Sequence, residues 1–128
     1  MVASSCVHRI LVVDDSAVIR TLLRGAIELH RGGRPIEIVE APDGGAALAA
    51  VRGGGIDVVL LDSHMPHVDG LTAIRSLRAE GSRVPIIVVT ADADPAHRAS
   101  AESAGCDAYI LKPFRLDQLW KAVEPFLP

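Results

Sequence analysis

The sequence predicts an α/β fold in which a five-stranded parallel sheet is doubly wound, with helices on both of its faces. Short aliphatic runs alternate along the 128 residues with stretches of helical period, five of each. Runs that are apolar at consecutive positions and rich in β-branched residues are typical of strands buried on both faces of a parallel sheet. Because parallel neighbours need a helical crossover, the alternation predicts the order (βα)5 with right-handed connections.

The five predicted strands are aliphatic because aromatic residues make up only 3% of the chain. They cover residues 9–14, 36–39, 58–62, 84–90 and 108–111. No linker, repeat or low-complexity tract interrupts the series. We therefore expect one domain over residues 1–128, with its core at about residues 8–127 and no output domain.

The first two predicted helices follow capping residues. Ser16 is a favourable N-cap for the first helix, because its hydroxyl can accept from the free N–H groups of the first turn. The apolar stripe expected to face the core consists of Val18, Leu22, Leu23, Ile27 and Leu29. Asp43 precedes the second helix, which covers residues 46–52 and closes on the glycines at residues 53–55.

The third and fourth predicted helices end at glycines. The third helix buries a stripe of Leu71, Ile74 and Leu77. Gly81 then stops it. Asp94 and Pro95 are typical of an N-cap and a first helical position, and Gly105 ends the fourth helix.

The last predicted helix carries the chain's single tryptophan. Its stripe is Leu116, Leu119 and Val123, and Pro125 limits its extension. Trp120 lies one position off this stripe. It therefore either covers the edge of the core or contributes to a docking face, and both alternatives stay open.

Composition excludes several classes of protein. The balance of 16 acidic and 13 basic residues gives a net charge of −3, which offers no electrostatic footprint for nucleic acid or an anionic membrane. We expect four arginines to lie on a solvated face: Arg20, Arg24, Arg75 and Arg78. No apolar run reaches the length of a membrane span, and the first eight residues lack the features of a secretory signal. Cys6 and Cys106 are expected to be free thiols rather than a disulfide, which fits a cytoplasmic location.

Polar residues stand at, or directly after, the carboxyl ends of the predicted strands. Five of them should meet on one rim of the sheet: Asp14, Asp15, Asp62, Thr90 and Lys112. Three carboxylates close together repel one another unless a cation lies among them, and carboxylate oxygens favour Mg²⁺. A lysine and a hydroxyl suit a phosphate, so the set indicates phosphoryl chemistry with an aspartate as acceptor.

Other interpretations of these and nearby residues are less well supported than a phosphoryl-transfer site. A structural ion-pair cluster would leave three acids against one base, an uncompensated excess. His64 and His67 flank Met65 and Pro66 and could be imagined as a metal pair, but they lie in a predicted loop without a third ligand, which disfavours zinc. The glycines at residues 53–55 lack the spacing of a dinucleotide-binding loop.

Four segments at the predicted strand ends carry a family resemblance. They are LVVDDSAVIR, LLDSHMPHVDG, VVTADA and AYILKPF. With these segments in this order, the chain resembles a receiver domain of two-component response regulators, of the single-domain, chemotaxis-regulator type, over about residues 8–127. The resemblance implies a flavodoxin-like, three-layer fold.

The resemblance also implies a metal site and a phosphoacceptor. Asp62 would accept the phosphoryl group, and Asp15 would bind Mg²⁺ directly. Asp14 would help through water or by holding Asp15, and the backbone carbonyl of His64 would be a further ligand. The His64 ring would face the mouth of the site, where it and Asp92 could tune hydrolysis of the acyl phosphate.

Further roles follow from the same resemblance. Thr90 would hydrogen-bond a phosphoryl oxygen, Lys112 would pair with another, and Ala91 would leave room for that approach. Tyr109 resembles the aromatic residue that changes rotamer as Thr90 moves. The bond from Lys112 to Pro113 matches a lysine–proline step that is often cis.

We therefore expect a phosphorylation-dependent switch rather than an enzyme acting on a separate substrate. A histidine kinase or histidine phosphotransfer protein would phosphorylate Asp62, aided by Mg²⁺ and by the receiver itself, and an unidentified downstream protein would bind the switched surface. Kinase specificity would lie near residues 17–24 and in the loop after Leu111. We expect a monomer, with weak association after phosphorylation.

Three alternatives remain. The first is a receiver belonging to a hybrid kinase or phosphorelay, and the second is a receiver-like binding module that is not phosphorylated. The third is a phosphatase with an aspartate nucleophile, but that class requires an aspartate two residues after the nucleophile, where this chain has His64.

Overall fold

The computed structural model describes residues 7–128 and contains the predicted alternation of strands and helices. The strands are β1 (His8–Val13), β2 (Ile36–Ala41), β3 (Val58–Leu61), β4 (Ile86–Thr90) and β5 (Ala108–Leu111). The helices are α1 (Ala17–His30), α2 (Gly44–Arg52), α3 (Gly70–Ala79), α4 (Pro95–Ala104) and α5 (Leu116–Val123), followed by a 3₁₀ turn at Glu124–Phe126.

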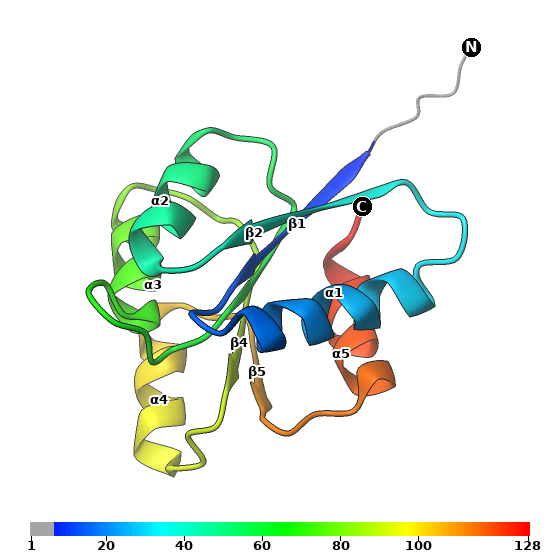
Figure 1. Cartoon of the computed structure of the whole chain (residues 1–128). Coiled ribbons are helices and arrows are strands. Elements are labelled where there is room, and N and C mark those ends of the chain that lie inside the picture. The colour runs from blue at the N-terminus through cyan, green and yellow to red at the C-terminus, as the bar shows by residue number, and fades with distance from the viewer. Residues whose placement is uncertain (1–6) are drawn as a thin grey trace.

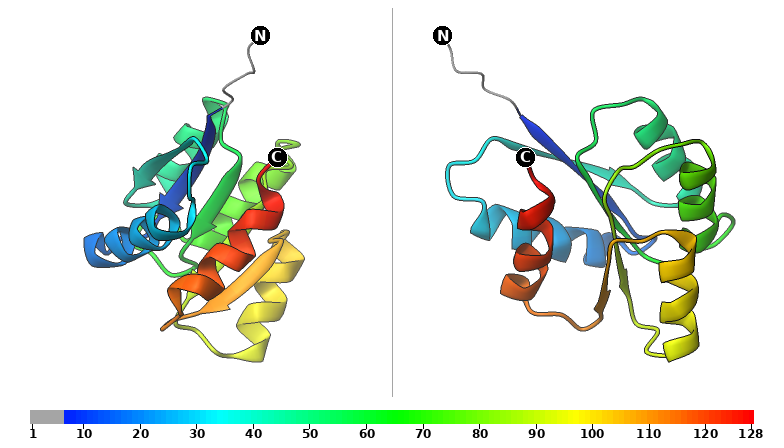
Figure 2. Two further views of the ribbon diagram at one scale, coloured as in Figure 1. Left: turned by 90° about the vertical axis from the view of Figure 1, so that its right-hand side faces the viewer. Right: turned by 180° about the vertical axis from the view of Figure 1, so that it is seen from behind.

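The strands form one parallel sheet in the order β2-β1-β3-β4-β5 (Figure 1). Helices α1 and α5 pack together on one face, while α2, α3 and α4 cover the other (Figure 2). The predicted doubly wound, flavodoxin-like architecture is therefore confirmed. Strand order reverses direction between β1 and β3, so the carboxyl ends of these two strands border a crevice where a site can form.

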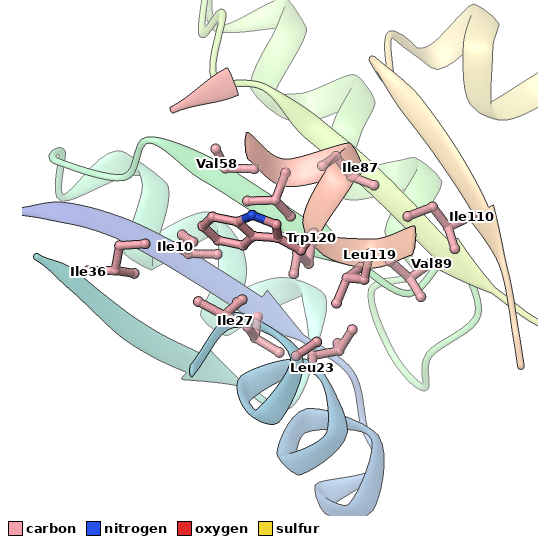
Figure 3. Close-up of a cluster of buried hydrophobic side chains, with 14 of the residues drawn as sticks. Ile10, Leu23, Ile27, Ile36, Val58, Ile87, Val89, Ile110, Leu119 and Trp120 are labelled. Carbon is pink, nitrogen blue, oxygen red and sulfur yellow. The ribbon is translucent and has the colours of Figure 1, made fainter. Parts of the chain in front are cut away.

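Alternate residues of each central strand enter separate cores on the two faces of the sheet. In β1, Ile10 and Val12 pack toward α1 and α5, whereas Leu11 and Val13 pack toward the other three helices. Figure 3 shows the first core, in which Trp120 lies among aliphatic side chains from the sheet. Trp120 is only 8% exposed, so of its two alternatives the structure supports the core.

The capping predictions for three helices are confirmed. Ser16 accepts from the Ile19 N–H at 3.3 Å, and Asp43 accepts from the Ala46 N–H at 2.8 Å. Asp94 likewise caps α4, and Gly105 ends that helix with a left-handed backbone, φ 114°. The cap of α3 is Asp69, which the sequence reasoning did not single out.

The predicted core stripe of α1 is partly wrong. Val18 and Leu29 are 70% and 69% exposed, and Leu22 is also exposed. The side chains that α1 buries are Leu23, Ala26 and Ile27. The exposed strip lies about a third of a turn away from the buried one, because successive helical residues advance by about 100°. On α5, Leu116 is exposed as well.

The prediction that four arginines form a solvated face is also partly wrong. Arg20 and Arg24 both pair with Glu40, at 3.0 and 2.8 Å. Arg78 is half-buried and donates to the carbonyl of Gly105 at 3.0 Å, so it joins α3 to the end of α4. Such contacts follow from tertiary packing, which the charge pattern does not encode.

Two other expectations concern membrane-spanning segments and the cysteines. Within residues 7–128, no helix combines the length and the apolar character needed to cross a membrane. Cys106 is half-buried, while Cys6 lies outside the described residues.

Candidate functional site

Two buried carboxylates and one ammonium group meet at the carboxyl ends of the strands. Asp14 follows β1, Asp62 follows β3 and Lys112 follows β5. Lys112 Nζ lies 2.7 Å from Asp14 Oδ2 and 3.6 Å from Asp62 Oδ2. Asp14 is 1% exposed, and its other oxygen accepts from the Ser16 N–H at 2.9 Å. The start of α1 therefore fixes the orientation of this carboxylate.

A third carboxylate completes the cluster. Asp15 is exposed, yet one of its carboxylate oxygens lies within 4.8 Å of oxygens of Asp14 and Asp62. Three acids face one lysine, so two negative charges are not neutralised by the residues of the cluster. Hard oxygen donors with excess negative charge are the ligands that Mg²⁺ prefers, so the residues fit that ion.

The environment of Asp62 disfavours its charged form. Burial raises the pKa of Asp62 above its ordinary value, and the negative charges of Asp14 and Asp15 raise it further. The His64 N–H, 3.1 Å from Asp62 Oδ1, and the Lys112 ammonium act in the opposite direction. A divalent cation among the carboxylates would favour the ionised, nucleophilic form.

The first residue of α3 packs directly on the backbone of Asp62. The Gly70 N–H donates to the Ser63 carbonyl at 3.1 Å. A Cβ at Gly70 would lie 2.2 Å from the Asp62 carbonyl oxygen, far inside contact distance. Glycine is therefore required here by close approach of the backbone, and this contact positions the end of β3.

The hydroxyl of Thr90 lies at the same rim but is held by other groups. Thr90 is buried at the end of β4, and Ser63 Oγ donates to its Oγ1 at 2.9 Å. The Asp92 N–H also donates to Thr90 Oγ1, at 3.2 Å. Tyr109 Oη donates to the Asp92 carbonyl at 2.7 Å, so Tyr109 contacts the loop that follows Thr90. The geometry links Thr90 to Asp62 through the neighbouring residue Ser63.

A second polar cluster borders the acids. His64 Nε2 lies 2.8 Å from Asp92 Oδ2, and this hydrogen bond is the largest cause that lowers the pKa of Asp92. The rings of His64 and His97 stack with centroids 4.5 Å apart. His97 Nε2 lies 2.8 Å from Ser63 Oγ. The sequence analysis assigned the His64 ring and Asp92 a shared role at the mouth of the site, but it did not foresee that His97 stacks on His64.

An apolar cleft of 310 Å³ opens beside Lys112. Its walls come from α1, from the loops after β4 and β5 and from the start of α5: Ile19, Leu22, Ala91, Pro113, Phe114 and Leu116. The peptide bond between Lys112 and Pro113 is cis, as the resemblance implied.

Comparison with known proteins decides the family. A model of the response regulator receiver domain matches residues 10–124. The chain belongs to this family. The receiver is 40% identical over 111 residues to the response regulator MprA of Mycobacterium sp. (strain KMS), covering 87% of the chain and 46% of that relative. The chain thus spans about half the length of the curated relatives it matches.

Solved receiver structures are similar throughout the domain. The receiver domain of Francisella response regulator 1452 superposes with a TM-score of 0.84 at 28% identity, over 93% of this chain and 95% of that one. The Vibrio cholerae chemotaxis protein CheY4 gives a TM-score of 0.80 at 28% identity, over 94% and 99% of the two chains.

The receiver brings most of the predicted site residues together. Asp14, Asp15, Asp62 and Lys112 form one cluster. Sequence reasoning missed Ser63 and His97. Ser63 directly follows the predicted acceptor Asp62 in the sequence, and this adjacency is the one signal that could have identified Ser63. His97 carries no such signal, because its contact with Ser63 joins residues 34 positions apart.

Proposed function

We propose that this receiver accepts a phosphoryl group on Asp62 in a Mg²⁺-dependent reaction. The donor would be a histidine kinase or a histidine phosphotransfer protein in the cytoplasm. The observation that carries the proposal is the cluster of three carboxylates and one lysine at the ends of β1, β3 and β5, in a chain of the receiver family. Residues 8–127 would act as one receiver domain.

The chemistry follows from the cluster. A carboxylate oxygen of Asp62 attacks phosphorus as the phosphorus–nitrogen bond of the donor phosphohistidine breaks, which leaves an acyl phosphate and a free imidazole. Lys112, 3.6 Å from Asp62 Oδ2, is placed to neutralise charge that develops on a phosphoryl oxygen. Mg²⁺ held by Asp15, Asp62 and the His64 carbonyl, with Asp14 acting indirectly, would supply further neutralisation and alignment.

Phosphorylation would then move Thr90. Its hydroxyl oxygen accepts from Ser63 in the structure, and a phosphoryl oxygen on Asp62 would give the proton of the same hydroxyl a charged acceptor. Movement of Thr90 would change the loop that contains Asp92, whose carbonyl holds Tyr109. The switched surface would comprise β4, α4 and β5, and binding of a downstream protein there would be the output.

The cleft beside Lys112 is suited to the phosphodonor protein. Exposed Leu22 of α1 shares the apolar wall with Pro113, Phe114 and Leu116, and exposed Val18 lies one helical turn before it. A protein seated there would bring its phosphohistidine toward Lys112 and Asp62. This placement agrees with the kinase-specificity segments expected from the sequence.

The test is intact mass after incubation with Mg²⁺ and a small acyl phosphate. Wild-type protein should gain one phosphoryl group, and the gain should be lost with EDTA and in Asp62→Asn. Asp57→Asn, which changes a carboxylate at the opposite end of β3, is the matched control and should still be phosphorylated. A wild-type chain that gains no phosphoryl group under these conditions would support the binding-module alternative instead.

A further inference from the structure

We propose that His64, Asp92 and His97 form a binding site for a divalent transition-metal ion such as Zn²⁺, distinct from the acidic site. One ligand atom from each side chain lies within 4.8 Å of the other two. The three residues come from the loop after β3, the loop after β4 and the first turn of α4. Two imidazoles and a carboxylate are a donor set that suits Zn²⁺, Ni²⁺ or Cu²⁺ better than Mg²⁺.

The distances are close to those of a metal site. His64 Nε2 and His97 Nδ1 lie 2.8 and 3.6 Å from the same oxygen, Asp92 Oδ2. Ligand atoms at the usual distances from a tetrahedral Zn²⁺ are about 3.4 Å apart. Binding therefore requires that His64 withdraw slightly from Asp92, and that the Nε2 proton of that hydrogen bond leave to solvent or be replaced by one on Nδ1. The His64 side chain is 61% exposed and is free to make that movement.

The hydrogen bonds of His97 prepare it as a ligand. Ser63 Oγ donates to Thr90, so it can accept from the Nε2–H of His97, 2.8 Å away. In that tautomer the lone pair of His97 lies on Nδ1 and faces the Asp92 carboxylate. Two electron-pair donors that face each other favour a cation between them. Metal-binding histidines commonly donate their other ring N–H to a fixed acceptor, which is the role of Ser63 here.

Solvent reaches part of the cluster, so water could complete the coordination of a bound ion. His64 and Asp92 are accessible, whereas His97 is 13% exposed and anchored by Ser63. A bound ion would thus have one fixed ligand, two accessible ligands and room for water, as in three-ligand zinc sites.

The experiment is a calorimetric Zn²⁺ titration of the unphosphorylated protein in excess Mg²⁺, which keeps the three acids at the strand ends occupied. We expect one histidine-dependent Zn²⁺ per chain, with affinity at least ten-fold lower in His97→Gln and in His64→Gln. His67→Asn is the matched control, because asparagine tolerates the positive φ of 68° at this position, and its affinity should be unchanged.

A second measurement does not depend on how the variants fold. In the NMR spectrum of wild-type protein, Zn²⁺ should shift the ring resonances of His64 and His97 and leave those of His67 in place. The proposal is overturned if His97→Gln binds Zn²⁺ as tightly as wild type, if His67→Asn weakens binding equally, or if neither ring responds. These outcomes do not test whether Asp62 can accept a phosphoryl group. The metal-site proposal and the proposed function can therefore fail independently of each other.

Discussion

Replacing Gly70 with alanine should destabilise the fold and slow phosphorylation together. The new Cβ would lie 2.2 Å from the Asp62 carbonyl oxygen and 2.7 Å from Ser63 Cα. Both are backbone atoms, so neither can rotate away. Ordinary contact begins at 3.4 Å, and the overlap with the oxygen is therefore 3.4 − 2.2 = 1.2 Å. Relief requires that α3 and the end of β3 move apart.

Overpacking of this kind costs about 1–3 kcal/mol, and we expect about 2–3 kcal/mol because only backbone can yield. For 128 residues, each kcal/mol lowers the melting temperature by about 4 °C, so Gly70→Ala should melt about 8–12 °C lower. A displacement of Asp62 by about 1 Å should reduce the rate of phosphorylation by about 10–100-fold.

Gly25→Ala is the matched control for this prediction. Gly25 lies on the exposed side of α1, and nothing lies within 4 Å of its added Cβ. Alanine is the better helix former, so this variant should gain about 0.5–1 kcal/mol. Urea denaturation and the phosphorylation rate from intact mass provide the assays. If Gly70→Ala were as stable as wild type, or phosphorylated at the wild-type rate, the conclusion that α3 positions Asp62 would be refuted.

Three further predictions can be checked by denaturation. Asp62→Asn in EDTA should stabilise the protein at neutral pH, because burial raises the folded-state pKa of Asp62 and the charged form opposes folding. The stability of the wild type should therefore fall as pH rises from the ordinary aspartate pKa through the raised pKa of folded Asp62. At low pH, where Asp62 is protonated, the variant should no longer be more stable than the wild type. A stability difference that persisted at low pH would contradict burial of the charged carboxylate as its cause. Ser16→Ala removes the cap that accepts from Ile19 and should cost about 1 kcal/mol in urea unfolding, and an unchanged midpoint would exclude a capping contribution. Trp120→Ala empties a buried site and should cost about 3–5 kcal/mol, whereas a loss below 1 kcal/mol would show that the side chain is not part of the core.

Local sequence patterns were sufficient for the fold because each of them has a local physical cause. The caps at Ser16, Asp43 and Asp94 each hydrogen-bond a backbone N–H two or three residues away, so they can be recognised without the tertiary structure. The buried strands are recognisable for a similar reason, since burial on both faces leaves no polar alternation. Positions at strand ends then follow from the geometry of a parallel sheet, which explains why Asp14 and Asp62 could be placed together.

The features that were missed depend on contacts between distant segments. Helix α1 carries two apolar strips, and only packing decides that Leu23 and Ile27 face the core while Val18 remains exposed. The stacking of His64 on His97 depends on how the loop after β3 meets the start of α4. Neither the periodicity nor the spacing of residues contains that information.

The order of the strands in the sheet also determines which parts of the molecule unfold locally most easily. The central strands β1, β3 and β4 consist almost entirely of buried residues, whereas the edge strands β2 and β5 are partly exposed along their length. Local unfolding begins where burial is least, so amide hydrogens of β5 should exchange before those of β1 and β3. Asp14 and Asp62 follow strands that open last, while Tyr109 and Lys112 belong to the edge. The carboxylate pair can therefore persist through fluctuations that rearrange the surface around β5.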